Sequence, residues 1–99
     1  MTDQELSIST RLSCQRALLG AITPGIRLIT IGWNGTDLFR LRAYFDHPPT
    51  EDEVFDMSAA STEVVADMAF LHDQVECLES DLPIGELEVD KFIVYLRKE

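Results

Sequence analysis

The sequence predicts an α+β fold, with two helices packed on one face of a mostly antiparallel four-stranded sheet. Three observations favour it: two β-rich stretches separated by Asn34-Gly35, a helix-start signal at residues 50–53, and an apolar run at residues 91–97. They place the elements in the order α-β-β-α-β-β. The 99 residues are expected to form a single domain, residues 1–99.

The first helix is expected from about residue 9 to residue 21. Apolar residues recur there at helical spacing, with Arg11, Gln15 and Arg16 between them. Thr23-Pro24-Gly25 ends the pattern. The preceding residues 1–7 are polar, and we expect them to form a disordered extension.

The Asn34-Gly35 pair predicts a hairpin between residues 26–33 and 36–45. Asn-Gly tolerates positive φ at both central positions, which suits a two-residue type I′ turn. This turn would set Trp33 opposite Thr36.

In that register the hairpin has one apolar face, which is the better candidate for the core, and one face that mixes apolar and basic residues. The apolar face carries Ile26, Leu28, Thr30, Phe39, Leu41, Ala43 and Phe45. The mixed face carries Arg27, Ile29, Ile31, Trp33, Leu38, Arg40, Arg42 and Tyr44.

Thr50-Glu51-Asp52-Glu53 has the pattern of a capping box and starts a second helix that should run to about Met68. Its expected buried stripe is Val54, Met57, Ser61, Val64, Val65 and Met68. Its expected solvent-facing acidic ridge is Glu53, Asp56, Ala60, Glu63 and Asp67. Residues 72–80 then predict a weaker strand, residues 81–86 a loop, and residues 91–97 the final strand.

Charge is strongly segregated along the chain. The formal net charge is -10, and no Lys or Arg occurs between Arg42 and Lys91. That stretch holds fourteen acids: Asp46, Glu51, Asp52, Glu53, Asp56, Glu63, Asp67, Asp73, Glu76, Glu79, Asp81, Glu86, Glu88 and Asp90. Such a surface repels nucleic acid and anionic lipid, so we expect neither as a partner and look instead for a basic one. A solvated acidic face that only aids solubility is the alternative.

Catalytic and metal-binding patterns are not recognisable. His47 and His72 have no neighbouring nucleophile arrangement, and with Cys14 and Cys77 they do not follow a zinc spacing. We therefore expect no enzyme activity, no metal and no cofactor. The chain shows no signal peptide and no apolar run of about 18 residues, which predicts a cytoplasmic protein with reduced cysteines.

Candidate partner-binding residues fall into three groups. They are the helix acids Glu53, Asp56, Glu63 and Asp67, the acids of the third-strand region Asp73, Glu76, Glu79 and Asp81, and the aromatics Trp33 and Tyr44 of the mixed hairpin face. Two structural alternatives stay open: Arg40 and Arg42 could pair across the sheet with Glu76 or Glu79, and the mixed face could be packed rather than exposed.

Several strings of the sequence carry a family resemblance: Ala17-Leu-Leu-Gly-Ala-Ile-Thr-Pro, Ile31-Gly-Trp-Asn-Gly, Arg42-Ala-Tyr-Phe-Asp, Pro49-Thr-Glu-Asp, Thr62-Glu-Val-Val-Ala-Asp67 and Val94-Tyr-Leu-Arg-Lys-Glu99. With them the chain resembles small bacterial immunity proteins, in particular the immunity partners of contact-dependent growth inhibition toxins. The resemblance implies tight binding to a cognate toxin domain, commonly a nuclease, and assigns no residue roles. A nuclease needs a basic cleft for phosphates, which an acidic protein can occupy. The alternative is a non-catalytic acidic adaptor domain without a toxin partner.

Overall fold

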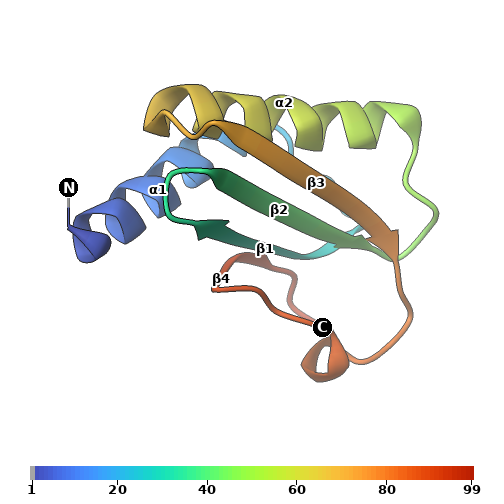
Figure 1. The fold of residues 1–99 in the computed structure, drawn as a ribbon. Helices are drawn as coiled ribbons and strands as arrows, with labels where there is room; N and C mark the ends of the chain where they lie inside the picture. The colour runs from blue at the N-terminus through green and yellow to red at the C-terminus, as the bar shows by residue number, and fades with distance from the viewer. Residues whose placement is uncertain (1) are drawn as a thin grey trace.

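A computed structural model describes residues 2–99, which form a helical layer over a four-stranded sheet (Figure 1). The elements are α1 (Asp3–Ala17), β1 (Ile26–Asn34), β2 (Leu38–Phe45), α2 (Glu51–Met68), β3 (His72–Glu79), the short 3-10 helix η1 (Ile84–Glu86) and β4 (Phe92–Leu96). Cys14 of α1 and Met57 and Val64 of α2 share one buried cluster with the sheet, so both helices cover the same face. The predicted α+β class is confirmed.

The sheet is mixed, which corrects the expected mostly antiparallel arrangement. The strand order is β3-β2-β1-β4; β1 pairs antiparallel with β2 and β4, whereas β2 and β3 are parallel. The reason is the helix between them: α2 carries the chain back across the sheet, so β3 runs in the same direction as β2. The ends of β2 and β3 and the start of α2 therefore meet at one end of the molecule (Figure 1).

The hairpin register differs from the expected one. Trp33 pairs with Phe39, and the loop is Gly35-Thr36-Asp37, closed by the Asp37 N–H donating to the Asn34 carbonyl at 3.0 Å. Only Gly35 in this loop has positive φ, at +54°, whereas a type I′ turn needs two such residues. The longer loop displaces the register by an odd number of residues, which reverses the faces of β1 relative to β2.

The reversal decides which residues form the core. Ile29, Ile31 and Trp33 of β1 lie with Phe39 and Leu41 of β2 in the cluster under the helices. The expected grouping of Leu28 and Thr30 with that face was wrong. Leu28 instead contacts Tyr44 and Leu87 on the opposite face, where residues 84–90 cross the sheet on the way to β4.

Helix α1 begins earlier than expected. Thr2 caps it by accepting a hydrogen bond from the Glu5 N–H at 3.1 Å, and the acids of the first turn suit the positive end of the helix dipole. Residues 3–7 are therefore helical, in contrast to the expected disordered extension; Met1 lies outside the described residues. The helix ends at Ala17 rather than residue 21, ahead of the turn that contains Gly20 at φ +81°.

Helix α2 has the bounds and the capping box that the sequence predicts. The Thr50 hydroxyl accepts from the Glu53 N–H at 3.2 Å, and the Glu53 carboxylate accepts from the Thr50 N–H at 2.9 Å. The buried face differs in detail: Ala60, expected on the acidic ridge, is 3% exposed, whereas Val54, expected in the core, is 41% exposed. The expected ridge is thus interrupted at its centre.

Candidate partner-binding surface

The acids of residues 46–90 divide into paired and unpaired groups. Six of them form ion pairs with Arg or His: Asp46, Glu53, Asp67, Glu76, Glu88 and Asp90. The other eight have no such partner anywhere in residues 2–99: Glu51, Asp52, Asp56, Glu63, Asp73, Glu79, Asp81 and Glu86. Within residues 46–90, the uncompensated negative charge therefore resides in this second group.

The arginines of the hairpin anchor the segment that crosses the second face of the sheet. Arg40 donates to both carboxylate oxygens of Asp90, at 2.8 and 3.1 Å, and this guanidinium lowers the pKa of Asp90. Arg42 lies between Glu76 at 3.2 Å and Glu88 at 3.4 Å. The structural pairing of Arg42 with Glu76, left open by the sequence, is confirmed, so Glu76 is engaged within the chain.

Two further arginines fasten the C-terminal segment beside the end of β3. Arg27, which is buried, donates to both carboxylate oxygens of Glu99 at 2.8 Å and to the Ser80 carbonyl at 2.7 Å. The hydrogen bond from Arg27 lowers the pKa of Glu99 to about 2. Arg97 bridges Asp46 at 2.7 Å and Glu99 at 2.9 Å. These contacts hold the residues that follow β2 and β3 in place.

His47 joins this end of the sheet to the start of α2. Its Nδ1 lies 2.7 Å from Asp46 and its Nε2 lies 2.7 Å from Glu53. Hydrogen bonds to the two carboxylates, first to Asp46 and then to Glu53, raise the pKa of His47. The Glu53 side chain is only 13% exposed, so this residue is a cap and a histidine partner rather than part of a solvent-facing ridge, which corrects the expectation for it.

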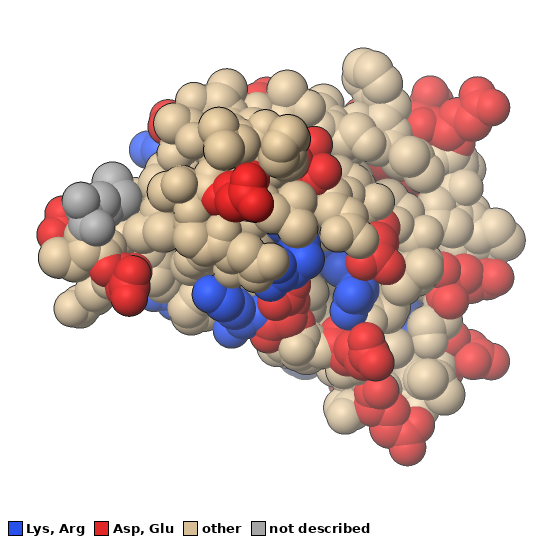
Figure 2. All heavy atoms as spheres, in the orientation of Figure 1, with Lys and Arg blue, Asp and Glu red and all other residues tan. Residues whose placement is uncertain are grey.

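Unpaired acids gather where β2 and β3 end and α2 begins. We call this surface the acidic end and define it as Glu51, Asp52, Glu79 and Asp81, all exposed. Glu79 and Asp81 also line a hollow of about 270 Å³. In Figure 2, red side chains crowd the right-hand end of the molecule, and blue ones lie mainly toward the lower middle of the view. Four carboxylates without cationic partners thus lie on this end of the molecule and give it a negative potential.

The other acids predicted for binding lie apart from the acidic end. Asp67, at the far end of α2, pairs with Arg16 of α1 at 3.3 Å, and Asp73 at the start of β3 accepts from the Ser61 hydroxyl at 2.7 Å. Asp56 and Glu63 lie along α2 with no cationic partner among the described residues. The structure therefore does not bring all the predicted acids together on one surface.

The two predicted aromatic contacts are buried within this chain. Trp33 is 5% exposed and stacks on Phe92, with ring centroids 5.5 Å apart. Tyr44 is 6% exposed, and its hydroxyl donates to the Glu88 carbonyl at 3.0 Å. The expectation that they share a half-exposed face was wrong: they occupy opposite faces of the sheet, because of the register described above.

Comparison with known protein families matches residues 7–99 to the family described as MafI2 immunity protein. The chain belongs to this family. The match confirms the expected class, a small bacterial immunity protein, and favours it over an adaptor domain without a toxin partner. No curated protein matches the chain. An immunity role implies a cognate toxin, so the exposed surface of this MafI2 family member is the part that matters for its function.

Among residues 2–99, no three His, Cys, Asp or Glu side chains come together as a metal site. Within the same residues, no helix is long and apolar enough to cross a membrane. Cys14 and Cys77 are both free, and burial raises the pKa of Cys14 to about 12.

Phe55 of α2 is an exposed aromatic residue that sequence reasoning missed. Its side chain is 71% exposed, and it lies within α2 close to Glu51, Asp52 and Asp56. The available signal was its position in the helical repeat, since Phe55 falls outside the stripe formed by Met57 and the other buried residues.

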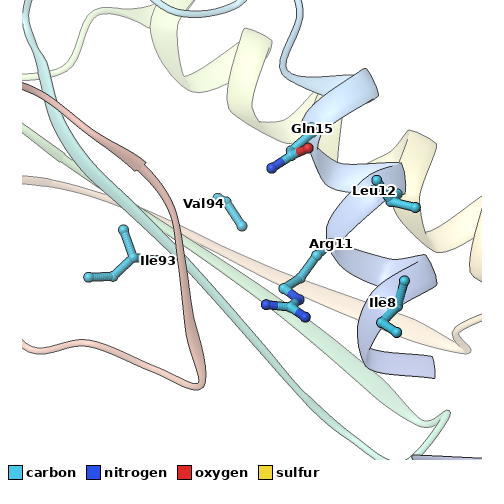
Figure 3. Close-up of a pocket in the computed structure, with 6 residues that line it drawn as sticks. All are labelled: Ile8, Arg11, Leu12, Gln15, Ile93 and Val94. Carbon is cyan, nitrogen blue, oxygen red and sulfur yellow. The ribbon is translucent and has the colours of Figure 1, made fainter. Parts of the chain in front are cut away.

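A second apolar surface lies between α1 and β4. Ile8, Leu12, Gln15, Ile93 and Val94 line a hollow of about 220 Å³ together with Arg11. Figure 3 shows Arg11 reaching from α1 toward the strand and Val94 pointing toward the helix, whereas Ile93 points away. The hollow is lined by a cation and no acid. Its charge therefore suits a basic partner less well than the acidic end and α2 do.

Proposed function

We propose that this MafI2 family member protects its host cell by binding a cognate toxin domain with a basic surface, and that it does so in the cytoplasm without catalysis. The observation that carries the proposal is the set of eight acids of residues 46–90 that have no cationic partner among the described residues, four of which form the acidic end. Uncompensated like charge opposes folding, and a cationic partner relieves that repulsion on binding.

A nuclease-type toxin is the partner that this charge fits best. Such an enzyme holds phosphates in a basic cleft, which an array of carboxylates can occupy in place of the nucleic acid. Complementary fields can raise the association rate toward 10⁸–10⁹ M⁻¹s⁻¹ at low salt, against about 10⁵–10⁶ M⁻¹s⁻¹ without steering. Fast capture is what a cell needs when the toxin acts inside it.

Exposure and ion pairing support a division of the candidate residues by the part that each would have in this interface. Acids without a cationic partner would meet the toxin domain. From the predicted set these are the exposed Glu63, Asp73, Glu79 and Asp81 and the half-buried Asp56, and the exposed Glu51 and Asp52 are added. The paired acids Glu53, Asp67 and Glu76 and the buried aromatics Trp33 and Tyr44 would support the surface from within the chain.

The proposal is tested with two variants, each of which neutralises three carboxylates at a different end of the molecule. One variant combines Glu51→Gln, Glu79→Gln and Asp81→Asn at the acidic end. The matched control combines Asp3→Asn, Glu5→Gln and Asp37→Asn at the opposite end, where α1 begins and the hairpin turns (Figure 1). Both variants change the net charge by the same amount and leave the arginine pairs intact.

We expect the acidic-end variant to associate with the toxin domain about tenfold more slowly at low salt, measured by stopped flow. The control should differ from wild type by about twofold or less, since its charges are farther from the contact and more strongly screened. Equal slowing of both would show that only net charge matters. No slowing of either would contradict an acidic interface.

A further inference from the structure

We propose that the outer face of α2 docks on the toxin domain through Phe55, which inserts into an apolar pocket whose rim carries Lys or Arg. This inference rests on the proposed function and names the helix face and the anchor residue. The face, called here the Phe55 face, consists of Glu51, Asp52, Phe55, Ala59 and Glu63, all exposed residues of α2.

Phe55 is the exposed member of the chain's eight aromatic residues; five others described here are buried and two are half-buried. Among residues 2–99, its ring belongs to neither buried cluster and stacks on no other ring; it is 71% exposed on a helix whose Met57 and Val64 supply the core contact. Aromatic residues are enriched at the centres of protein interfaces, where a rigid ring buries a large area at a small entropic cost.

The neighbours of Phe55 leave its ring accessible. Ala59 lies one turn later on the same side of the helix, and its side chain is a single methyl group. Glu51 lies one turn earlier, and Asp52 lies beside it. A partner surface can therefore close around the ring without displacing a bulky side chain, which matches the way an amphipathic helix docks into a groove.

The charge around the ring identifies the occupant of this face. Acids lie on both sides of Phe55 along α2, and the helix contains no Lys or Arg. The surface over the right-hand half of α2 shows red and tan spheres only (Figure 2). A second copy of this chain would bring like charges together, and nucleic acid or anionic lipid would be repelled. The arrangement instead fits a basic protein, which here is the cognate toxin domain.

The test compares Phe55→Ala with Leu71→Ala, a loss of exposed apolar surface elsewhere. Leu71 is 70% exposed and follows the far end of α2, where its N–H donates to the Thr36 carbonyl of the hairpin loop. Phe55→Ala should leave the fold intact, because the ring makes no core contact and alanine favours an exposed helical site. Unfolding midpoints in urea verify this before binding is measured.

Surface plasmon resonance with the toxin domain then measures the dissociation rate, which reports anchoring by Phe55, separately from the association rate, which reports electrostatic steering. We expect Phe55→Ala to raise the dissociation rate at least tenfold and to change the association rate by less than about twofold, since no charge is lost. Leu71→Ala should leave both rates within about twofold of wild type. A dissociation rate for Phe55→Ala within twofold of wild type, or the same increase for both variants, would overturn the assignment.

The result also distinguishes this inference from the proposed function. If Phe55→Ala is neutral while the acidic-end variant associates slowly, the toxin is bound by charge and Phe55 is not an anchor. If the toxin domain does not bind wild-type protein at all, the proposed function itself fails.

Discussion

Replacing Gly32 with alanine should destabilise the protein through Asp90. Gly32 is buried in β1, and a Cβ atom there would overlap all three atoms of the Asp90 carboxylate. The carboxylate can leave only by giving up its two hydrogen bonds with Arg40, at 2.8 and 3.1 Å. Both side chains are substantially shielded, at 25% and 20% exposed, so water would replace these bonds poorly.

The expected cost follows from two opposing effects. Loss of a shielded, bidentate, charge-assisted pair costs about 2–3 kcal/mol, between the values for exposed and fully buried pairs. Alanine in a strand regains about 0.5–1 kcal/mol relative to glycine. The net loss of unfolding free energy should be about 2 kcal/mol, which corresponds to a decrease in Tm of about 10 °C for a domain of this size.

Urea denaturation of a double-mutant cycle tests the mechanism. In an Asp90→Ala background the obstacle is gone, so Gly32→Ala should become neutral or slightly stabilising. Gly85→Ala is the control in the wild-type background, because a Cβ at Gly85 meets nothing within 4 Å. A loss that persists unchanged in the Asp90→Ala background would refute the steric coupling, as would wild-type stability of Gly32→Ala.

Two further predictions concern the start of α2. Thr50→Ala removes the capping box and should lower the free energy of unfolding in urea by about 1 kcal/mol. The control Thr62→Ala removes an exposed hydroxyl that is bonded only to the Ser58 carbonyl, and it should change this free energy by less than about 0.5 kcal/mol. Equal losses in the two variants would contradict the cap. The pKa of His47 is raised in the folded protein, so its contribution to stability is present below pH 6.5 and should be lost as the pH rises through the folded pKa. His47→Ala should therefore flatten this part of the plot of unfolding free energy against pH. An unchanged slope of that plot would count against the contacts with Asp46 and Glu53.

Local signals in the sequence predicted the elements more accurately than their pairing. The start of α2 was correctly placed because Thr50 and Glu53 form a cap within one turn. The hairpin register was wrong because it depends on loop length, which Asn34-Gly35 does not determine by itself. The parallel pairing of β3 was missed because it depends on where the chain lies after α2.

The sign of the charge on the candidate surface was predictable from the sequence, but the location of that surface was not. Ion pairs form between residues distant in the sequence, as for Arg40, Arg42 and Arg27, so the fold determines which carboxylates remain unpaired. Glu53 illustrates the difficulty: its position in the helix repeat places it with the acids of the ridge, while its contacts with His47 and Thr50 withdraw it from solvent. Phe55 could have been noticed from the sequence, as an aromatic residue outside the apolar stripe of α2.

The central claim is that an acidic surface of this MafI2 family member captures a basic toxin domain. The most direct measurement is the association rate of the wild-type chain with that domain as salt rises from about 10 mM to about 1 M, which shortens the screening length from about 30 Å to about 3 Å. We predict that the association rate falls by one to three orders of magnitude while the dissociation rate changes far less. An association rate that is independent of salt, or that increases with it, would contradict the claim.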